Sequence, residues 1–374
     1  MGRHRAGPGR TGLRHHPDEL LSGHGIATDL LTGRGSWAMA ERLRLGIVGA
    51  GAITQVGHLP ALKRAKEIEV VGICDNDLAK ARALADRFNI PTAHSDIAEL
   101  VDYEQLDALL ICTPNHLHES HILAALARKL HVLVERPVAM TSAGAQKILK
   151  AQAKHDRVVM VGANHRYRPD VQMIRSFVES GELGELESIR AWWFMSRAGQ
   201  TSLGWRQRRD QAGGGAMLDL GLGILDLSMW LAGFPRPTRV SAVFPEKGTT
   251  KGVEPSGTAM VALEGGLAVH LDTSWRFVGP GERYGVALRA SRGSARIAPL
   301  AIWKDFHGVT RDVATAGAHS RESPFAIGVR AQWAHFVAAV RGDAKAPSLT
   351  ENVRALTVME GMYESAESGR DVVL

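Results

Sequence analysis

Short apolar runs alternate with helical segments between residues 43 and 161. The runs are LRLGIVG, EVVGICD, DALLICTP, HVLVERP and RVVMVGA, and each has the length of one buried strand. Repetition of strand, helix and strand predicts a parallel sheet with helices on both faces. We therefore expect an α/β domain over residues 39–162.

The pattern changes after residue 163. The runs AMVALE, LAVHLDTSW, YGVALRAS and SARIAPL are separated by turns and predict a mostly antiparallel open sheet. The closing stretch ENVRALTVMEGMYESAESG has helical periodicity that ends near Gly369, and it carries no chemistry that we can identify. A chain of 374 residues is long enough for two cores, so we expect a second, α+β domain over residues 163–374.

The stretch GGGAMLDLGLGILDLSMWLAG, residues 213–233, predicts a buried helix that contains residues unfavourable to a helix. Asp219, Gly223 and Asp226 have the spacing i, i+4, i+7 and should share one face. A glycine inside a helix costs about 1 kcal/mol relative to alanine, so an enlarged pocket at Gly223 is one interpretation. The alternatives are a helix N-cap for Asp219 and a hydrogen bond into the core for Asp226.

The first expected strand ends in a glycine turn, LGIVGAGAITQ. Gly49, Gly51 and Thr54 occupy a G-x-G-x-x-[G/A] pattern, in which the first glycine permits a tight turn and the second a close approach of backbone to a diphosphate. The N–H groups of Ala52 and Ile53 would point at the phosphates from the start of the next helix. Thr54 is bulkier than the pattern's glycine or alanine and predicts slightly looser packing of helix on strand.

An acidic residue closes the second expected strand. Asp75 follows Gly51 by 24 positions, the separation expected for a carboxylate that accepts the hydroxyls of the adenosine ribose. No arginine follows it directly, so NAD is favoured over NADP. The strand order, the turn and the acid together predict a dinucleotide-binding Rossmann domain.

The amino-acid composition argues against a nucleic-acid-binding protein, a disulfide-bonded protein and a metal site. The formal net charge of +6 is modest for 374 residues and the basic residues are scattered, so we expect no nucleic acid partner. Cys74 and Cys112 lie in apolar runs, which indicates a reducing compartment, the cytoplasm, without disulfides. No grouping of Cys and His has the spacing of a metal site, so we expect no metal.

Residues 1–38 are rich in Gly, Arg and His, and we expect a disordered extension there. A start at Met39 would remove it without touching the fold. No segment reaches the ~18 uninterrupted apolar residues that a membrane span requires. We therefore expect no membrane partner.

Five segments in a specific order carry a family resemblance. They are LICTPNHLHESHILAAL (110–126), HVLVERPVAMT (131–141), VGANHRYRPD (161–170), ESGELGELESIRA (179–191) and the stretch 213–233. From Leu43 to the C terminus the chain resembles the Gfo/Idh/MocA oxidoreductases, the family of glucose-fructose oxidoreductase and inositol dehydrogenase. The resemblance implies an enzyme that uses NAD to transfer a hydride to or from a hydroxyl carbon of a sugar, polyol or related compound. It also implies a homodimer or homotetramer formed through the exposed face of the second sheet.

In that family the loop after the fourth strand runs beneath the nicotinamide. The residues that this resemblance assigns to cofactor contact are Thr113, Pro114, Asn115 and His118. An exposed histidine on a helix is the alternative for His118.

The family's E-K-P motif corresponds to Glu135, Arg136 and Pro137. Glu135 and Arg136 are thereby expected at the cofactor, and Arg136 takes the place of a lysine that lies between the nicotinamide ribose and the substrate hydroxyl. A buried lysine can give up its proton, whereas a guanidinium stays charged at any working pH. Arg136 can therefore clamp or polarise an oxygen atom but cannot be a base.

The family pattern G-G-G-x-x-x-D-x-G-x-H-x-x-D aligns with residues 213–226, which places Gly223 at the histidine. The resemblance makes Asp219 the first candidate for the proton acceptor, ahead of His165 and then Tyr167. His165 can equally orient a loop or bind a substrate hydroxyl.

Substrate contacts are expected from a set of residues around the same cleft: Asn164, Arg166, Tyr167, Trp205, Arg206 and Gly223. Aromatic and arginine side chains suit a sugar ring that bears an acidic group, and a solvated loop is the alternative for the arginines. His270 and Trp275 are expected to be packing or interface residues. Two other functions stay open: a dinucleotide-binding sensor or accessory protein without turnover, and redox-neutral sugar chemistry with a recycled NAD.

Overall fold

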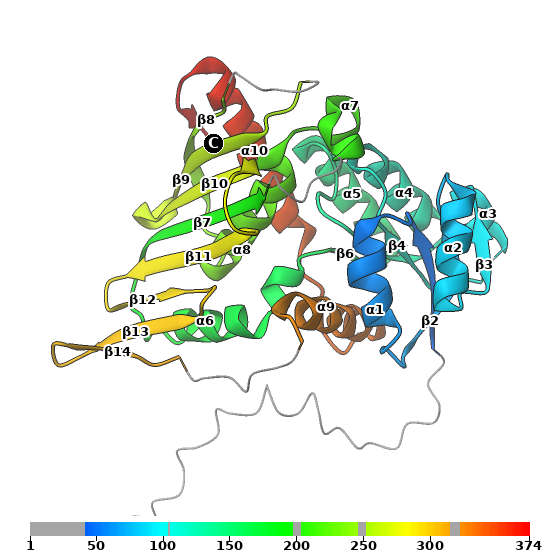
Figure 1. Cartoon of the computed structure of the whole chain (residues 1–374), viewed down its shortest axis with the longest axis horizontal. Helices are drawn as coiled ribbons and strands as arrows, with labels where there is room; N and C mark the ends of the chain where they lie inside the picture. Colours follow the sequence, from blue (N-terminus) through cyan, green and yellow to red (C-terminus); the bar gives the residue numbers. More distant parts are fainter. Residues whose placement is uncertain (1–41, 104, 197–202, 246–251, 315–321) are drawn as a thin grey trace, which may run out of the picture. The chain divides into compact units, whose positions relative to one another are not determined.

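The first sheet consists of six strands in the order β3-β2-β1-β4-β5-β6, all parallel (Figure 1). The strands are β1 (Leu43–Val48), β2 (Ile68–Cys74), β3 (Thr92–His94), β4 (Ala108–Ile111), β5 (His131–Val134) and β6 (Val159–Val161). The order reverses between β1 and β4, where sheets of this kind bind ligands beyond the carboxyl ends of their strands. The predicted parallel α/β domain is confirmed.

Helices cover both faces of this sheet. They are α1 (Leu59–Leu62), α2 (Leu78–Phe88), α3 (Ile97–Tyr103), α4 (Asn115–Ala127) and α5 (Ser142–His155). Successive residues of β4 point to opposite faces of the sheet. Leu109 packs in one core with residues of α4 and α5, and Leu110 packs in the other core with residues of α2. Helix α9 (Pro324–Arg341) also packs on the α2 side, through Trp333 and Phe336. The core expected from residues 39–162 is thus completed by a helix from near the end of the chain.

The second sheet has nine strands in the order β14-β13-β12-β11-β7-β10-β9-β8-β15. They are β7 (Leu186–Ser196), β8 (Pro237–Val243), β9 (Ser256–Leu263), β10 (Ala268–Phe277), β11 (Arg283–Ala290), β12 (Gly293–Arg296), β13 (Ala301–Phe306), β14 (Val309–Asp312) and β15 (Val372–Val373). Within the described residues of this second sheet only β7 and β10 pair in parallel, so the predicted, mostly antiparallel sheet is confirmed.

The computed structural model describes residues 42–103, 105–196, 203–245, 252–314 and 322–374, and the expected extension 1–38 lies outside them.

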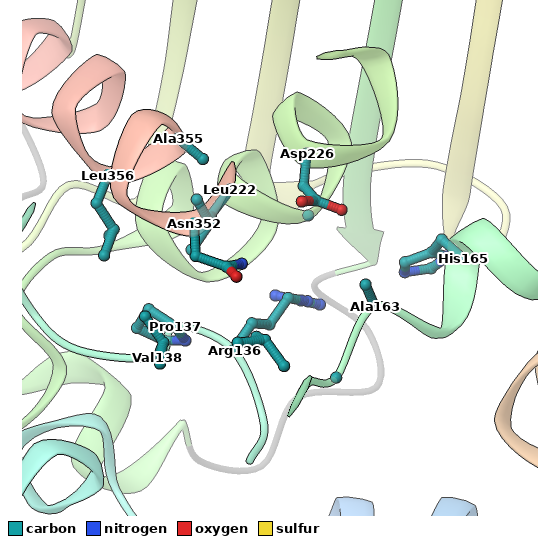
Figure 2. Close-up of a pocket in the computed structure, with 13 residues that line it drawn as sticks. Arg136, Pro137, Val138, Ala163, His165, Leu222, Asp226, Asn352, Ala355 and Leu356 are labelled. Atoms are coloured by element: carbon teal, nitrogen blue, oxygen red, sulfur yellow. The ribbon is translucent and has the colours of Figure 1, made fainter. Parts of the chain in front are cut away.

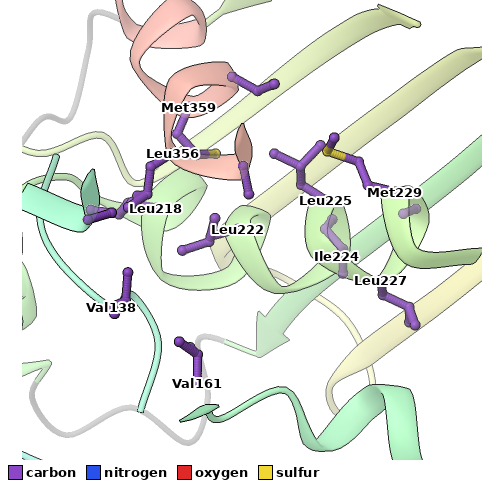
Figure 3. Close-up of a cluster of buried hydrophobic side chains, with 14 of the residues drawn as sticks. Val138, Val161, Leu218, Leu222, Ile224, Leu225, Leu227, Met229, Leu356 and Met359 are labelled. Atoms are coloured by element: carbon purple, nitrogen blue, oxygen red, sulfur yellow. The ribbon is translucent and has the colours of Figure 1, made fainter. Parts of the chain in front are cut away.

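Four further helices accompany this sheet: α6 (Pro169–Glu179), α7 (Arg209–Ala212), α8 (Leu222–Leu231) and α10 (Leu349–Ser368). Figure 3 shows α8 side chains near residues of α10, Val138 of the loop after β5 and Val161 at the end of β6. Within the described residues, Arg209–Leu231 is long and apolar enough to cross a membrane, but 89% of its most apolar window is buried inside the protein. Its apolar character is that of a core helix.

The three glycines before α8 are explained by close contacts. Gly213 has a φ of +85°, which favours glycine. A Cβ on Gly214 would lie 2.0 Å from the Tyr363 hydroxyl, and one on Gly215 would lie 2.0 Å from the Glu254 carbonyl oxygen. The Glu254 carboxylate is buried and accepts hydrogen bonds from Gly215 N at 2.9 Å, from Met217 N at 2.9 Å and from the Tyr363 hydroxyl at 2.8 Å.

Replacing Glu254 by alanine should therefore leave two backbone N–H groups and a hydroxyl without acceptors. Each buried donor left unsatisfied costs about 1–3 kcal/mol, so we expect the loss of acceptors for three donors in Glu254→Ala to lower the free energy of unfolding by about 3 kcal/mol or more in urea denaturation. Glu264→Ala, on an exposed residue, is the matched control and should change it by less than about 0.5 kcal/mol. Equal midpoints for the two variants would contradict this role of Glu254.

Candidate functional site

The glycine turn after β1 is tight at one residue and open at another. Gly49 has a φ of +101°, and a Cβ there would lie 2.5 Å from the Cys112 carbonyl oxygen. A Cβ on Gly51 would meet nothing within 4 Å, so no neighbouring protein atom requires glycine there. Thr54 is fully buried and its hydroxyl donates to Gly49 O at 2.6 Å, a stabilising bond that the sequence pattern does not predict. The turn thus leaves a backbone edge accessible at residue 51, as a bound diphosphate requires.

Asp75 lies at the end of β2 beside this turn. Its carboxylate accepts hydrogen bonds from Ala50 N at 2.7 Å and from Asp77 N at 3.1 Å, and its side chain is 11% exposed. The Lys80 ammonium lies 3.3 Å from Asp75 Oδ2, a contact that the sequence analysis missed. The carboxylate is therefore fixed next to the open backbone edge.

The buried side chain of His118 connects the loops after β4 and β5. The His118 ring is buried, with Nε2 2.8 Å from Thr113 O and Nδ1 2.6 Å from Pro137 O. Asn115 Nδ2 donates to Ala212 O at 2.8 Å and so connects this loop to the segment before α8. His118 is not the exposed helix histidine considered above, and both side chains position the loops that carry the expected cofactor contacts.

Glu135 connects the second of these loops to α9. The indole N–H of Trp333 donates to His58 Nδ1 at 3.1 Å, so His58 Nε2 carries the proton that faces Glu135 Oε1 at 3.0 Å. Burial alone would raise the pKa of Glu135, but the hydrogen bond from His58 and the charge of Arg136 outweigh it and lower that pKa. The sequence gives no signal for this chain of contacts, because His58 and Trp333 lie 275 positions apart.

Arg136 fills the volume beside Gly223. Its guanidinium lies over the Trp193 ring, 5.2 Å from the centroid, and donates to the Asp219 carbonyl oxygen. A Cβ on Gly223 would lie 3.2 Å from Arg136 Cζ and 3.3 Å from Trp193 Cζ3. Gly223 therefore makes room for two large side chains rather than leaving an empty pocket.

The regular helix face that was expected to carry Asp219 together with Gly223 and Asp226 is interrupted at Asp219. Met217–Gly221 form a π-helical turn, and the extra residue in such a turn breaks the 3.6-residue phase on which the expected stripe rests. The carboxylate accepts from Trp275 Nε1 at 3.1 Å and from Arg206 Nε at 3.3 Å, and it makes no N-cap hydrogen bond. Trp275 packs in the core, as expected, and it also positions Asp219.

Asp226 belongs to a buried ion-pair network. Arg166 donates to both of its oxygens, at 2.8 and 2.5 Å, and also to Glu351 at 2.6 Å. Burial opposes the positive charge of Arg166, but the two carboxylates outweigh it and raise its pKa. Arg166, expected to contact substrate, instead has its guanidinium occupied by these two acids.

His165 has the one side-chain nitrogen in the described part of the site that is buried and unpartnered, Nδ1. The ring stacks on Tyr284 at 4.9 Å and meets Trp193 edge-on at 5.2 Å. Burial lowers the pKa of His165 well below its ordinary value, and the charges of Arg136 and Arg168 lower it further. The imidazole is therefore neutral near pH 7 and offers a nitrogen that no protein group uses.

Four of the residues described above, Arg136, His165, Gly223 and Asp226, line one cavity, which Figure 2 shows in close-up. Its described lining consists of Arg136, Pro137, Val138, Val161, Gly162, Ala163, His165, Leu222, Gly223, Asp226, Asn352, Ala355 and Leu356. The last three come from α10, the helix to which the sequence analysis assigned no chemistry. Helical periodicity predicts this helix but not which elements its residues will meet.

Two other residues expected to contact substrate, Trp205 and Tyr167, pack against neighbouring side chains. Arg206 lies over the Trp205 ring, 4.5 Å from the centroid. Tyr167 packs on His335 at 5.4 Å, and burial raises the pKa of Tyr167, so its hydroxyl keeps its proton and no phenolate is available to accept another. Within the described residues, no three His, Cys, Asp or Glu side chains form a group that could hold a metal ion.

Comparisons with known proteins agree with the two-sheet fold. Residues 43–163 match the oxidoreductase family with an NAD-binding Rossmann fold, and residues 171–296 match the GFO/IDH/MocA C-terminal domain. D-glucoside 3-dehydrogenase of Escherichia coli (strain K12) is 28% identical over 360 residues, 89% of this chain and 97% of that protein. The putative UDP-kanosamine synthase oxidoreductase subunit of Amycolatopsis mediterranei (strain S699) is 30% identical over 260 residues, 70% of this chain and 71% of that protein.

Solved structures share the fold at lower identity. Levoglucosan dehydrogenase in complex with NADH and levoglucosan superposes with a TM-score of 0.80 and 21% identity, over 89% of this chain and 99% of that one. GenD2 from gentamicin A biosynthesis in complex with NAD has a TM-score of 0.78 and 24% identity, over 92% and 99%.

The depressed pKa of His165 predicts a pH dependence of stability. Below about pH 6.5 the unfolded chain binds a proton at this imidazole and the folded chain does not, so the free energy of unfolding falls as the pH falls, by up to about 1.4 kcal/mol per pH unit. We expect His165→Phe to make this fall shallower between pH 7 and pH 5 in urea denaturation. Arg136→Met should also make it shallower, because it removes a charge that depresses the pKa. Identical slopes in all three proteins would contradict a neutral, buried His165.

Proposed function

The chain belongs to the Gfo/Idh/MocA oxidoreductase family, and we propose that it is an NAD-dependent dehydrogenase acting on a hydroxyl carbon of a sugar, polyol or related compound. The observation that carries the proposal is the open backbone edge at Gly51 beside the Asp75 carboxylate, at the switch point of the first sheet. Relatives named as sugar dehydrogenases support the substrate class.

The residues present fit a dinucleotide. The N–H groups of Ala52 and Ile53 would hold the diphosphate, and Asp75 would accept the hydroxyls of the adenosine ribose. Two loops would position the nicotinamide. The loop after β4 carries Thr113 and Pro114, and the loop after β5 carries Glu135. When bound, NAD supplies the acceptor for the hydride that leaves the carbinol carbon.

Two side chains would serve the substrate oxygen. Arg136 keeps its positive charge and would stabilise the negative charge that develops on the oxygen as its proton leaves. His165 Nδ1, neutral and without a protein partner, would take that proton. Both side chains contact Trp193, which would fix their separation. We place Asp219 in a positioning role, because its carbonyl holds Arg136 and its carboxylate is already bonded to Trp275 and Arg206.

This arrangement favours turnover over a binding-only role. The binding-only alternative rested on the loss of a histidine at residue 223 and a lysine at residue 136. Arg136 and Trp193 fill that volume with a charged and an aromatic group, and His165 supplies an imidazole from another loop. Redox-neutral chemistry with retained NAD would use the same residues, and copurified cofactor that never exchanges would indicate it.

We further propose a homodimer or homotetramer formed through the exposed face of the second sheet. A groove on this face is lined by aromatic and charged side chains, including Trp192, Phe194, His270 and Arg283. Aromatic residues and arginine are the types enriched at interfaces. A monomer in sedimentation equilibrium would refute this assembly.

Asp75→Ala should weaken NAD binding, because the ribose hydroxyls lose a charged acceptor. Hydrogen bonds to charged groups contribute about 1.5–3 kcal/mol, which corresponds to about a 10- to 100-fold rise in the dissociation constant measured by calorimetry. Asp86→Ala, on an exposed residue of α2, is the matched control. Identical NAD affinity in the two variants would remove Asp75 from the cofactor site.

His165→Gln should lower kcat by about 10²- to 10⁴-fold with unchanged NAD affinity, because the proton acceptor is lost. The assay follows the absorbance of reduced nicotinamide over a screen of sugar alcohols, aldoses and uronic acids. Asp219→Asn should cost less, since the backbone carbonyl that holds Arg136 is retained. His307→Gln, an exposed residue on a hairpin, is the control. Full activity of His165→Gln together with inactivity of Asp219→Asn would transfer the base to Asp219.

A further inference from the structure

Arg136 differs from the other arginines around the site in having no acid to pair with. The others are paired: Arg166 with Asp226 and Glu351, Arg168 with Asp170, and Arg206 with Asp219. In the described part of the chain no carboxylate oxygen lies within 4.0 Å of the Arg136 guanidinium, whose protein acceptor is the Asp219 carbonyl. The Glu135 carboxylate is near enough for the charge of Arg136 to lower its pKa, but it is hydrogen-bonded to His58, so the Arg136 guanidinium has no direct ion pair of its own.

The position of this guanidinium is fixed by packing. Trp193 lies against one face of it, and Gly223 leaves the space that it occupies. A guanidinium carries five N–H donors in a planar fork that matches a carboxylate. Donation to one carbonyl leaves most of them for a ligand.

A second unused donor points into the same cavity. Figure 2 shows the Asn352 side chain reaching from α10 towards Arg136, and in the described part of the chain its amide has no hydrogen-bond partner. Both residues line the same small cavity. A carboxylate oxygen is small enough to reach both donors there, and an anion matches the charge of the guanidinium.

We propose that the substrate carries a carboxylate on the carbon next to the reacting carbinol, held by Arg136 and Asn352, so that the enzyme oxidises a 2-hydroxy acid of the sugar-acid class. This inference rests on the proposed function. The step balances, because R–CHOH–COO⁻ and NAD⁺ give R–CO–COO⁻, NADH and a proton. Bound NAD⁺ would accept the hydride of the broken carbinol C–H bond, and His165 Nδ1 would accept the hydroxyl proton as the C=O bond forms.

A bound carboxylate would also correct a weakness of His165 as a base. Burial and the charges of Arg136 and Arg168 keep the pKa of His165 low, which makes the imidazole a poor proton acceptor. An anion beside Arg136 offsets that charge and raises the pKa towards the working range. A neutral polyol brings no such charge, so the site discriminates in the chemical step as well as in binding.

The test compares matched substrates that differ only in this group, D-gluconate and D-glucitol, with the full-length protein and NAD⁺. We expect kcat/KM to be at least about 100-fold higher for the aldonate, and Arg136→Gln to reduce that preference to less than about threefold. Arg289→Gln, on an exposed residue of β11, is the control and should keep the full preference. Equal use of the two substrates by the wild-type protein would overturn the proposal.

A binding measurement without turnover accompanies the assay. Calorimetry of the NADH-loaded protein should show malonate bound at least about 30-fold more tightly than malonamide, with the difference lost in Arg136→Gln and reduced in Asn352→Leu. Malonate affinity unchanged by Arg136→Gln would overturn the carboxylate site while leaving the dehydrogenase proposal intact. Failure of NADH itself to bind in the same experiment would overturn the proposed function, and this inference with it.

Discussion

The guanidinium of Arg136 occupies the space that a side chain at residue 223 would need, and the arrangement of the site depends on this packing. Trp193 closes one side of the guanidinium and the Asp219 carbonyl holds its end. A charge is thereby placed at the cavity in one orientation, and His165 is placed against the other side of the same indole. The positions that the family resemblance connects with a lysine and a histidine are therefore neighbours in space here, and a side chain at 223 larger than glycine would require Arg136 or Trp193 to shift.

Helices from the end of the chain hold this arrangement in place. Trp333 of α9 reaches Glu135 through His58, and Glu351 of α10 reaches Asp226 through Arg166. Removing one partner of a buried ion pair leaves a charge without compensation and costs more than an exposed pair contributes. The residues next to Arg136 and His165 in the chain, Glu135 and Arg166, are thus held by buried contacts with α9 and α10.

The features that the sequence predicted are those that depend on residues close together in the chain. The strands from β1 to β6 were predicted wherever an apolar run was long enough, and β3 was missed because three residues give no periodicity. The glycine turn and Asp75 were found because their spacing along the chain reflects one compact unit. The stripe through Asp219, Gly223 and Asp226 failed at its first member, since a π-helical turn shifts the phase of the side chains and no sequence rule used here detects one. Glu254 and Asn352 were missed for another reason: each gains its role from an element far away in the chain, and that pairing exists only in the folded protein.

The volume relation between residues 136 and 223 is the central claim, and a double-mutant cycle measures it directly. Arg136→Lys, Gly223→His and the double variant would be compared by their free energies of unfolding in urea. Gly223→His alone should be strongly destabilising, because the imidazole and the guanidinium compete for one space, and Arg136→Lys should relieve part of that cost, which gives a coupling of at least about 1 kcal/mol. Additive effects within about 0.5 kcal/mol would show that the two positions do not share this volume and would contradict the account.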